Sequence, residues 1–117
     1  MTTQGGAVKS GYALNVRFTT RDADAAQRFD ALVARTLEGI RNEPGTLVYV
    51  VHEPENEPLV RVFYELYADY EAFQAHEEQE HTKRMLAERG QYLASTEVEF
   101  MTELTGKRPA TKTTEAP

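Results

Sequence analysis

Two kinds of apolar spacing alternate along this chain, and their order constrains the fold more than any single motif does. Residues Tyr12–Thr19 alternate apolar and polar side chains with a period of two, which is typical of a strand with two unlike faces. From about Ala23 to Arg41 the apolar residues recur at spacings of three and four, which predicts a helix with one buried face. The folded part therefore begins with a strand followed by a helix.

The next segments predict three more strands and a second helix. Two runs rich in β-forming residues, Thr46–His52 and Leu59–Tyr67, are separated by the polar turn 53–58, so they should pair as a hairpin. A second helix is predicted from Tyr70 to about Arg89, although apolar residues are sparse in it. The alternating segment Glu97–Leu104 predicts the last strand.

The resulting order, β-α-β-β-α-β, is that of the α+β ferredoxin-like fold, in which an antiparallel sheet carries its helices on one face. The other face of the sheet also needs cover, because neither face of the two middle strands is consistently polar. We therefore expect a homodimer in which two copies cover each other's sheets and form a dimeric α/β barrel.

The 117 residues suit one domain, which we predict to span residues 11–104. The segments 1–10 and 105–117 hold few apolar side chains and are predicted to be disordered tails. The first residues lack the apolar core of a signal peptide, and no run is long and apolar enough to span a membrane.

The charge and the cysteine count exclude several classes of function. The chain has 13 Lys and Arg against 19 Asp and Glu, so its net charge of -6 argues against binding nucleic acid or an anionic membrane. It has no cysteine, which excludes disulfides, thiolate nucleophiles and cysteine-ligated metals. A cytoplasmic protein that binds a small molecule fits these observations.

Three short motifs recur here in a characteristic order and spacing. Glu43-Pro44-Gly45 precedes a strand, the run FYELYADYEAFQAH occupies residues 63–76, and a second histidine follows at His81. In this combination the chain resembles the antibiotic biosynthesis monooxygenase family over residues 11–104. Each motif is weak alone, and the family's frequent Trp after the "YE" pair is Tyr67 here.

This resemblance implies dimeric α/β barrels with a pocket between helices and sheet. Many such proteins oxidise phenolic or quinol-type aromatics with molecular oxygen and use neither metal nor flavin. Others degrade haem, and related proteins isomerise small phosphorylated compounds, so the fold alone does not fix the reaction. The sequence holds no phosphate-binding loop or dinucleotide motif, and we expect no cofactor.

Three polar residues are the candidates for catalysis. His76 and His81 have side chains that titrate near neutrality, so either could be the base that deprotonates a phenol. On one continuous helix they would lie about 140° apart, which does not indicate a metal pair. Asn15 is unusual in a strand and could donate a hydrogen bond to a substrate oxygen. The alternative is that all three are ordinary solvated or packed side chains.

Four more residues are candidates for binding the substrate: Tyr67, Tyr64, Phe73 and Arg61. The two tyrosines fall on opposite faces of their strand, so at most one of them can line a given pocket. Phe73 also suits the core. Arg61 could orient a substrate, but a structural ion pair, for example with Glu65, is the simpler interpretation.

The leading functional hypothesis is a cofactor-independent monooxygenase acting on a small electron-rich aromatic. An isomerase or lyase of a small carbonyl or phosphorylated compound is the second, and a non-catalytic dimeric ligand-binding protein is the third. Haem binding is weaker, because Asn15 and His81 match the Asn, Trp and His set of the haem-degrading branch but His76 stands in the place of the Trp.

Overall fold

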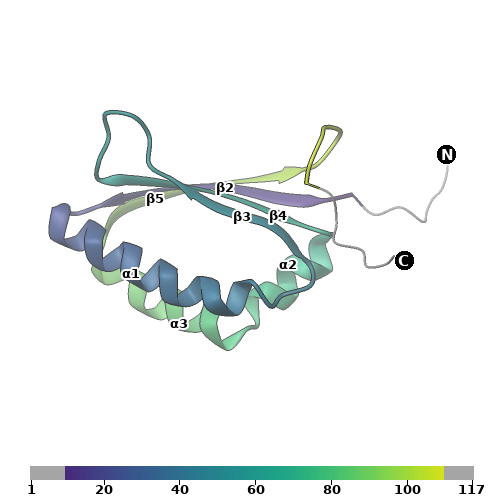
Figure 1. Cartoon of the computed structure of the whole chain (residues 1–117), viewed down its shortest axis with the longest axis horizontal. Coiled ribbons are helices and arrows are strands. Elements are labelled where there is room, and N and C mark those ends of the chain that lie inside the picture. Colours follow the sequence, from purple (N-terminus) through teal and green to yellow (C-terminus); the bar gives the residue numbers. More distant parts are fainter. Residues whose placement is uncertain (1–9, 110–117) are drawn as a thin grey trace, which may run out of the picture.

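The computed structural model describes residues 10–109 and shows a four-stranded antiparallel sheet with its helices on one face (Figure 1). The strand order is β3-β4-β2-β5, which confirms the predicted ferredoxin-like α+β fold. In chain order the elements are β2 Tyr12–Thr20, α1 Ala23–Ile40, β3 Thr46–His52, β4 Val60–Tyr67, α2 Tyr70–Glu77, α3 Glu80–Glu88, the 3-10 helix η1 Arg89–Gln91 and β5 Leu93–Thr102.

Two aspartates fix where α1 and α2 begin. Asp22 adopts an extended backbone, and its side chain accepts a hydrogen bond of 2.8 Å from the backbone N–H of Ala25. Asp69 does the same for Ala72 at the start of α2, again at 2.8 Å. Each cap satisfies a backbone donor that the first helical turn leaves free.

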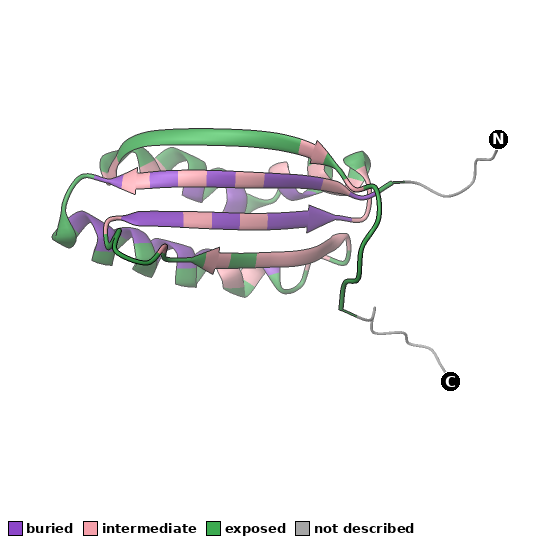
Figure 2. Cartoon of the chain, turned by 90° about the horizontal axis from the view of Figure 1, so that it is seen from above, coloured by how far each residue is buried: buried purple, intermediate pink, exposed green. Residues whose placement is uncertain are grey.

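The sheet register sorts the side chains of the central strands into two sets. β2 pairs with β4 so that Leu14 lies opposite Glu65 and Val16 lies opposite Phe63. This set faces the helices and forms most of the core with Phe18. The alternate residues face away from the helices. Figure 2 looks onto this helix-free face, where burial is concentrated along the two central strands.

The predicted second helix is wrong in one respect, because it is two helices. α2 ends at Glu77 and α3 begins at Glu80, and Gln79 between them has an extended backbone with φ -70° and ψ 145°. No aliphatic residue in this stretch anchors a continuous helix to the core. The break reorients α3 relative to α2, and this decides where the two histidines lie.

The last strand also differs from its prediction, because it runs over Leu93–Thr102 and not Glu97–Leu104. It is an edge strand whose residues are mostly exposed, so its apolar pattern is weak, and its extent follows from pairing along the whole of β2.

Most of both predicted tails, 1–10 and 105–117, lies outside the described residues. None of the helices within residues 10–109 is long and apolar enough to cross a membrane.

Candidate active site

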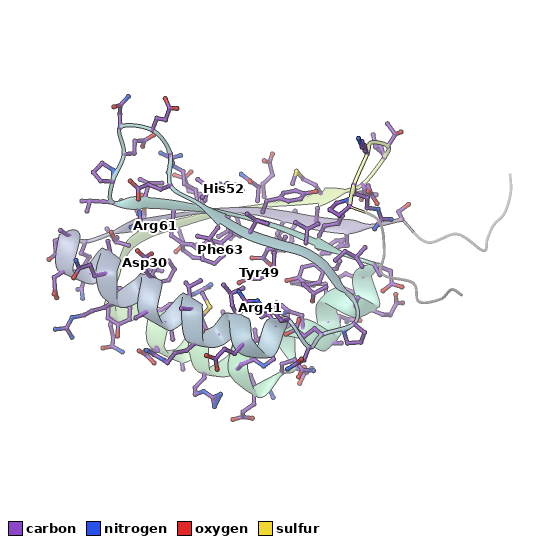
Figure 3. All side chains as sticks on the ribbon, in the orientation of Figure 1. Asp30, Arg41, Tyr49, His52, Arg61 and Phe63 are labelled. Atoms are coloured by element: carbon purple, nitrogen blue, oxygen red, sulfur yellow. The ribbon has the colours of Figure 1, made fainter. Side chains whose placement is uncertain are left out.

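A cavity of about 280 Å³ lies between the sheet and the helices. We call it the central cavity. Its walls are mainly apolar and aromatic, and they also include two glutamates, a histidine and an arginine. Figure 3 shows Tyr49, one of its wall residues, in the layer between sheet and helices. The lining residues used below are Phe18, Tyr49, Glu65, His76, Glu77 and Arg89.

Glu65 brings a buried carboxyl group to this cavity. Its side chain comes from the helix-facing side of the central strand β4, and the residue is only 6% exposed. The Tyr67 hydroxyl donates a hydrogen bond of 2.7 Å to Glu65 Oε1. Burial raises the pKa of Glu65 to about 7, against a partial lowering by the bond from Tyr67. Glu65 can therefore both take up and release a proton near neutral pH.

The nearby phenols are held in their neutral form. Burial, together with the charge and hydrogen bond of Glu65, raises the pKa of Tyr67 far above its ordinary value. Burial likewise raises the pKa of Tyr49. Both hydroxyls therefore keep their protons at neutral pH and do not act as bases. Tyr67 donates to Glu65, whereas Tyr49 forms part of the aromatic wall.

Glu43 joins the two predicted histidines. His76 Nδ1 lies 2.8 Å from Glu43 Oε1, and His81 Nε2 makes a short contact with Glu43 Oε2. The Thr46 hydroxyl donates a third hydrogen bond to Oε1, at 2.6 Å. The glutamate side chain is 8% exposed, so these bonds replace the water that it loses on burial.

This arrangement fixes the chemistry of His76. When Glu43 is ionised its carboxylate only accepts hydrogen bonds, and in that state the Nδ1 atom of His76 is the donor. In the neutral ring the other nitrogen, Nε2, is then the basic one. The ring lines the central cavity and packs on Tyr67 with their centroids 5.1 Å apart. His76 thus has the tautomer and surroundings of an oriented general base.

His81 does not line the central cavity, and it contacts Glu43, which in turn contacts the cavity residue His76. It belongs to a separate surface groove between α1 and α3. Its ring fits because residue 39 of α1 is glycine, since a Cβ atom there would overlap the imidazole. The break between α2 and α3 lets both histidines reach one carboxylate, which a continuous helix would not allow.

The structure separates the other candidates into three groups. Asn15 pairs across the sheet with Tyr64, and both lie on the helix-free face, away from the central cavity. Tyr67 and Phe73 lie on the helix side, where Phe73 lines the cavity and Tyr67 is fully buried behind it. As predicted, the two tyrosines of β4 are on opposite faces.

Arg61 lies at the far end of the sheet and does not line the cavity. Its guanidinium donates two hydrogen bonds to Asp30 of α1, at 2.8 and 3.0 Å (Figure 3). It therefore forms a structural ion pair, but with Asp30 and not with Glu65.

The residues of the haem-degrading set do not come together. Asn15 faces away from the helices, whereas His81 is held by Glu43 between α1 and α3. Within residues 10–109, no cluster of His, Asp and Glu is arranged to hold a metal ion.

Comparison with known proteins places these features in a family. The model of the family described as antibiotic biosynthesis monooxygenase (ABM) matches residues 12–88, which include Glu43, Glu65 and both histidines. The chain belongs to the ABM family. No curated protein sequence matches it.

Solved structures show the same ABM fold. Rv0793 from Mycobacterium tuberculosis superposes with a TM-score of 0.78 at 25% identity, over 85% of this chain and 100% of that one. PA3566 from Pseudomonas aeruginosa gives 0.76 at 19% identity, covering 86% and 100%. A Caulobacter crescentus protein named as a candidate antibiotic biosynthesis monooxygenase gives 0.77 at 22% identity, covering 84% and 93%.

Sequence reasoning missed three charged residues that the structure brings to this region: Glu43, Glu65 and Arg89. The strand periodicity already placed Glu65 among apolar neighbours, which is a usable signal for a buried carboxyl. Glu43 was visible only as part of a turn motif. Arg89 had no signal, because it ends a helix among other charged residues.

Proposed function

We propose that this ABM protein is a cofactor-independent monooxygenase that oxidises a small phenolic or quinol-type aromatic with molecular oxygen. One observation carries the proposal: an aromatic-walled cavity contains a carboxylate-oriented imidazole, His76, beside a buried carboxyl with a near-neutral pKa, Glu65. The apolar walls suit a flat ring, and the two ionisable groups suit the movement of its protons.

The reaction needs a base first. His76 Nε2 takes the proton of the phenolic hydroxyl, and the electron-rich phenolate then reduces oxygen and forms a C–O bond at a ring carbon. The resulting peroxide oxygen takes a proton back from His76. Glu65, in its ionised form, removes the hydrogen of that ring carbon while the O–O bond breaks. The departing hydroxide then takes this proton from Glu65, so that a quinone and water leave and the carboxylate is restored. One phenol and one O₂ give one quinone and one H₂O.

Each group has a distinct role in this scheme. Glu43 holds His76 in the basic tautomer and stabilises the imidazolium that forms. His81 and Thr46 hold Glu43 in place and are positioning residues. The hydrogen bond from the Tyr67 hydroxyl holds the Glu65 carboxyl group in place, and the Tyr67 ring lies behind the cavity wall.

Oxygen uptake by metal-free protein with a panel of naphthols and quinols tests the proposal. We expect uptake above autoxidation with one O₂ consumed per quinone, and a loss of about 100-fold or more in kcat for His76→Gln. His52→Gln, which changes an exposed histidine on β3, is the matched control and should retain full activity. Uptake that equals autoxidation for every compound would contradict a monooxygenase.

The same pair of proton-exchanging groups also favours a second candidate, an isomerase or lyase of a small carbonyl compound. His76 and Glu65 would then remove and return a proton on carbon, and oxygen would take no part. Turnover under strict anaerobiosis separates this reaction from the first. Saturable binding of the panel without turnover in air or under nitrogen would instead favour a ligand-binding protein.

We further propose a cytoplasmic homodimer, since proteins of this family are commonly dimers. The helix-free face supports this, because its Val50 is 44% exposed and Val62 and Tyr64 are only partly covered. A second copy placed on this face would bury these side chains together with Asn15.

A further inference from the structure

Arg89 is the one lysine or arginine among residues 10–109 that lines the central cavity. It follows α3 directly and begins η1, and the residue is partly buried. Its guanidinium carbon lies 5.2 Å from the centre of the Phe18 ring, in a cation–π contact. Phe18 is itself 1% exposed, so it is a rigid platform for the cation.

This arginine has no ion-pair partner within the described part of the chain, unlike several other arginines. Arg61 pairs with Asp30, Arg17 with Glu57, and Arg35 with Glu88. Glu65 and Glu77 line the same cavity, and within residues 10–109 neither forms an ion pair with Arg89, although the rise that burial causes in the pKa of Glu65 is partly offset by the charge of Arg89. A guanidinium offers five donors in a planar fork that matches a carboxylate. Arg89 keeps this fork available to a ligand in the cavity.

Arg89 and the proton-exchanging groups border different parts of the cavity wall, although the pKa of Glu65, which burial raises, is still lowered in part by the charge of Arg89. Phe18 and Leu14 both line it, and they are four residues apart on β2, which corresponds to about 13 Å. Arg89 lies over Phe18, whereas Glu65 pairs with Leu14 across the sheet. Tyr49 also pairs with Glu65 and contacts His76. A ligand that contacts both sets of residues places an anionic group beside Arg89 and a hydroxyl beside His76 and Glu65.

We propose that Arg89 forms an anion subsite and that the substrates are hydroxylated aromatic carboxylates. The carboxylate accepts hydrogen bonds from Arg89, and the ring system occupies the apolar middle of the cavity. The reacting hydroxyl then lies beside His76 and Glu65. The position of the hydroxyl rests on the proposed function, whereas the anion subsite does not.

Calorimetric titration with two probes that cannot be oxidised in this way tests the subsite. Naphthoate carries the carboxylate, and naphthalenemethanol has a neutral group of similar size. We expect the wild-type protein to bind naphthoate more tightly, and Arg89→Met to weaken naphthoate binding by about tenfold or more. Naphthalenemethanol should bind both proteins within about twofold. Arg89→Lys, which keeps the charge but loses the fork, should fall between them.

Arg84→Met is the matched control, because Arg84 is an exposed arginine on α3 outside the central cavity. It should bind both probes as the wild type does, and thermal unfolding verifies that each variant is folded. No preference of the wild type for naphthoate, or an equal loss of both probes in Arg89→Met, would overturn the subsite. These titrations involve no turnover. They therefore test the anion subsite even if the oxygen-uptake assay contradicts the proposed function.

Discussion

At the scale of single residues, Glu65 should link stability to pH. Its pKa rises from 4.5 to about 7 on folding, chiefly through burial, so the folded protein binds a proton between these pH values that the unfolded chain does not. Stability therefore falls as the pH rises through this window and levels off above it. We expect Glu65→Gln, which does not titrate, to gain up to about 3 kcal/mol on the wild type between pH 4.5 and pH 8.

Urea unfolding of both proteins at the two pH values measures this difference. The glutamine oxygen still accepts the hydrogen bond from Tyr67, so packing changes little. Glu97→Gln, at an exposed position on β5, is the control for the effect of removing an ordinary carboxyl group on the unfolding free energy. A stability difference between wild type and Glu65→Gln that does not change with pH would show that the carboxyl is ordinary.

Glu43 should matter more than its distance from the substrate suggests. Glu43→Gln leaves one histidine facing an amide donor, so we expect a stability loss of about 1–3 kcal/mol and a kcat reduced at least about tenfold with KM nearly unchanged. The nitrogen chemical shifts of His76 should report a change of tautomer. His81→Gln should shift the pH profile of kcat more than KM. Unchanged histidine spectra in Glu43→Gln would contradict its positioning role.

At the scale of elements, the break between α2 and α3 and the contact of α3 with α1 place His81 on Glu43. Gly39→Ala tests this contact. In an ordinary helix interior this substitution stabilises by about 0.5–1 kcal/mol, but here the new Cβ overlaps the His81 ring. We expect Gly39→Ala to lose stability and to lower kcat through the displaced His81.

Gly90→Ala is the control for this substitution, because a Cβ at residue 90 meets no atom within 4 Å and its backbone is not in the left-handed region. It should gain a few tenths of a kcal/mol and leave activity unchanged. If the two variants gained stability equally, the packing of His81 against α1 would be wrong. Thermal unfolding and kcat measured on both variants decide this.

The helix break also shows where sequence reasoning stops at this scale. The bounds of β3 were predictable to the residue, because a continuous β-forming run ends in a clear turn. The break at Gln79 was not, since neither glycine nor proline marks it and the surrounding residues are uniformly polar. The angular argument that kept His76 and His81 apart was sound for a regular helix and failed only because the helix is interrupted.

At the scale of the whole molecule, periodicity and element order were enough for the ferredoxin-like sheet, because core burial fixes them. The candidate site was predictable only in part. His76 was found from its residue type, but Glu43 reaches it from the turn after α1, far away in the sequence. Strand periodicity could place Asn15 on one face of its strand and Leu14 and Val16 on the other. Only the position of the helices shows which of these faces has the cavity.

The assembly gives the last prediction. If the helix-free face joins two copies, a charge at its centre must be desolvated in the dimer. Tyr64 lies on central strand β4 of this face, next to Asn15 of β2. We expect wild-type protein to be a dimer at micromolar concentration by light scattering, and Tyr64→Glu to be a folded monomer. Tyr70→Glu places the same charge at an aromatic residue on α2, 50% exposed, and should remain dimeric. A monomeric wild type would show that water covers this face. A dimer that survives Tyr64→Glu would show that another surface joins the two copies.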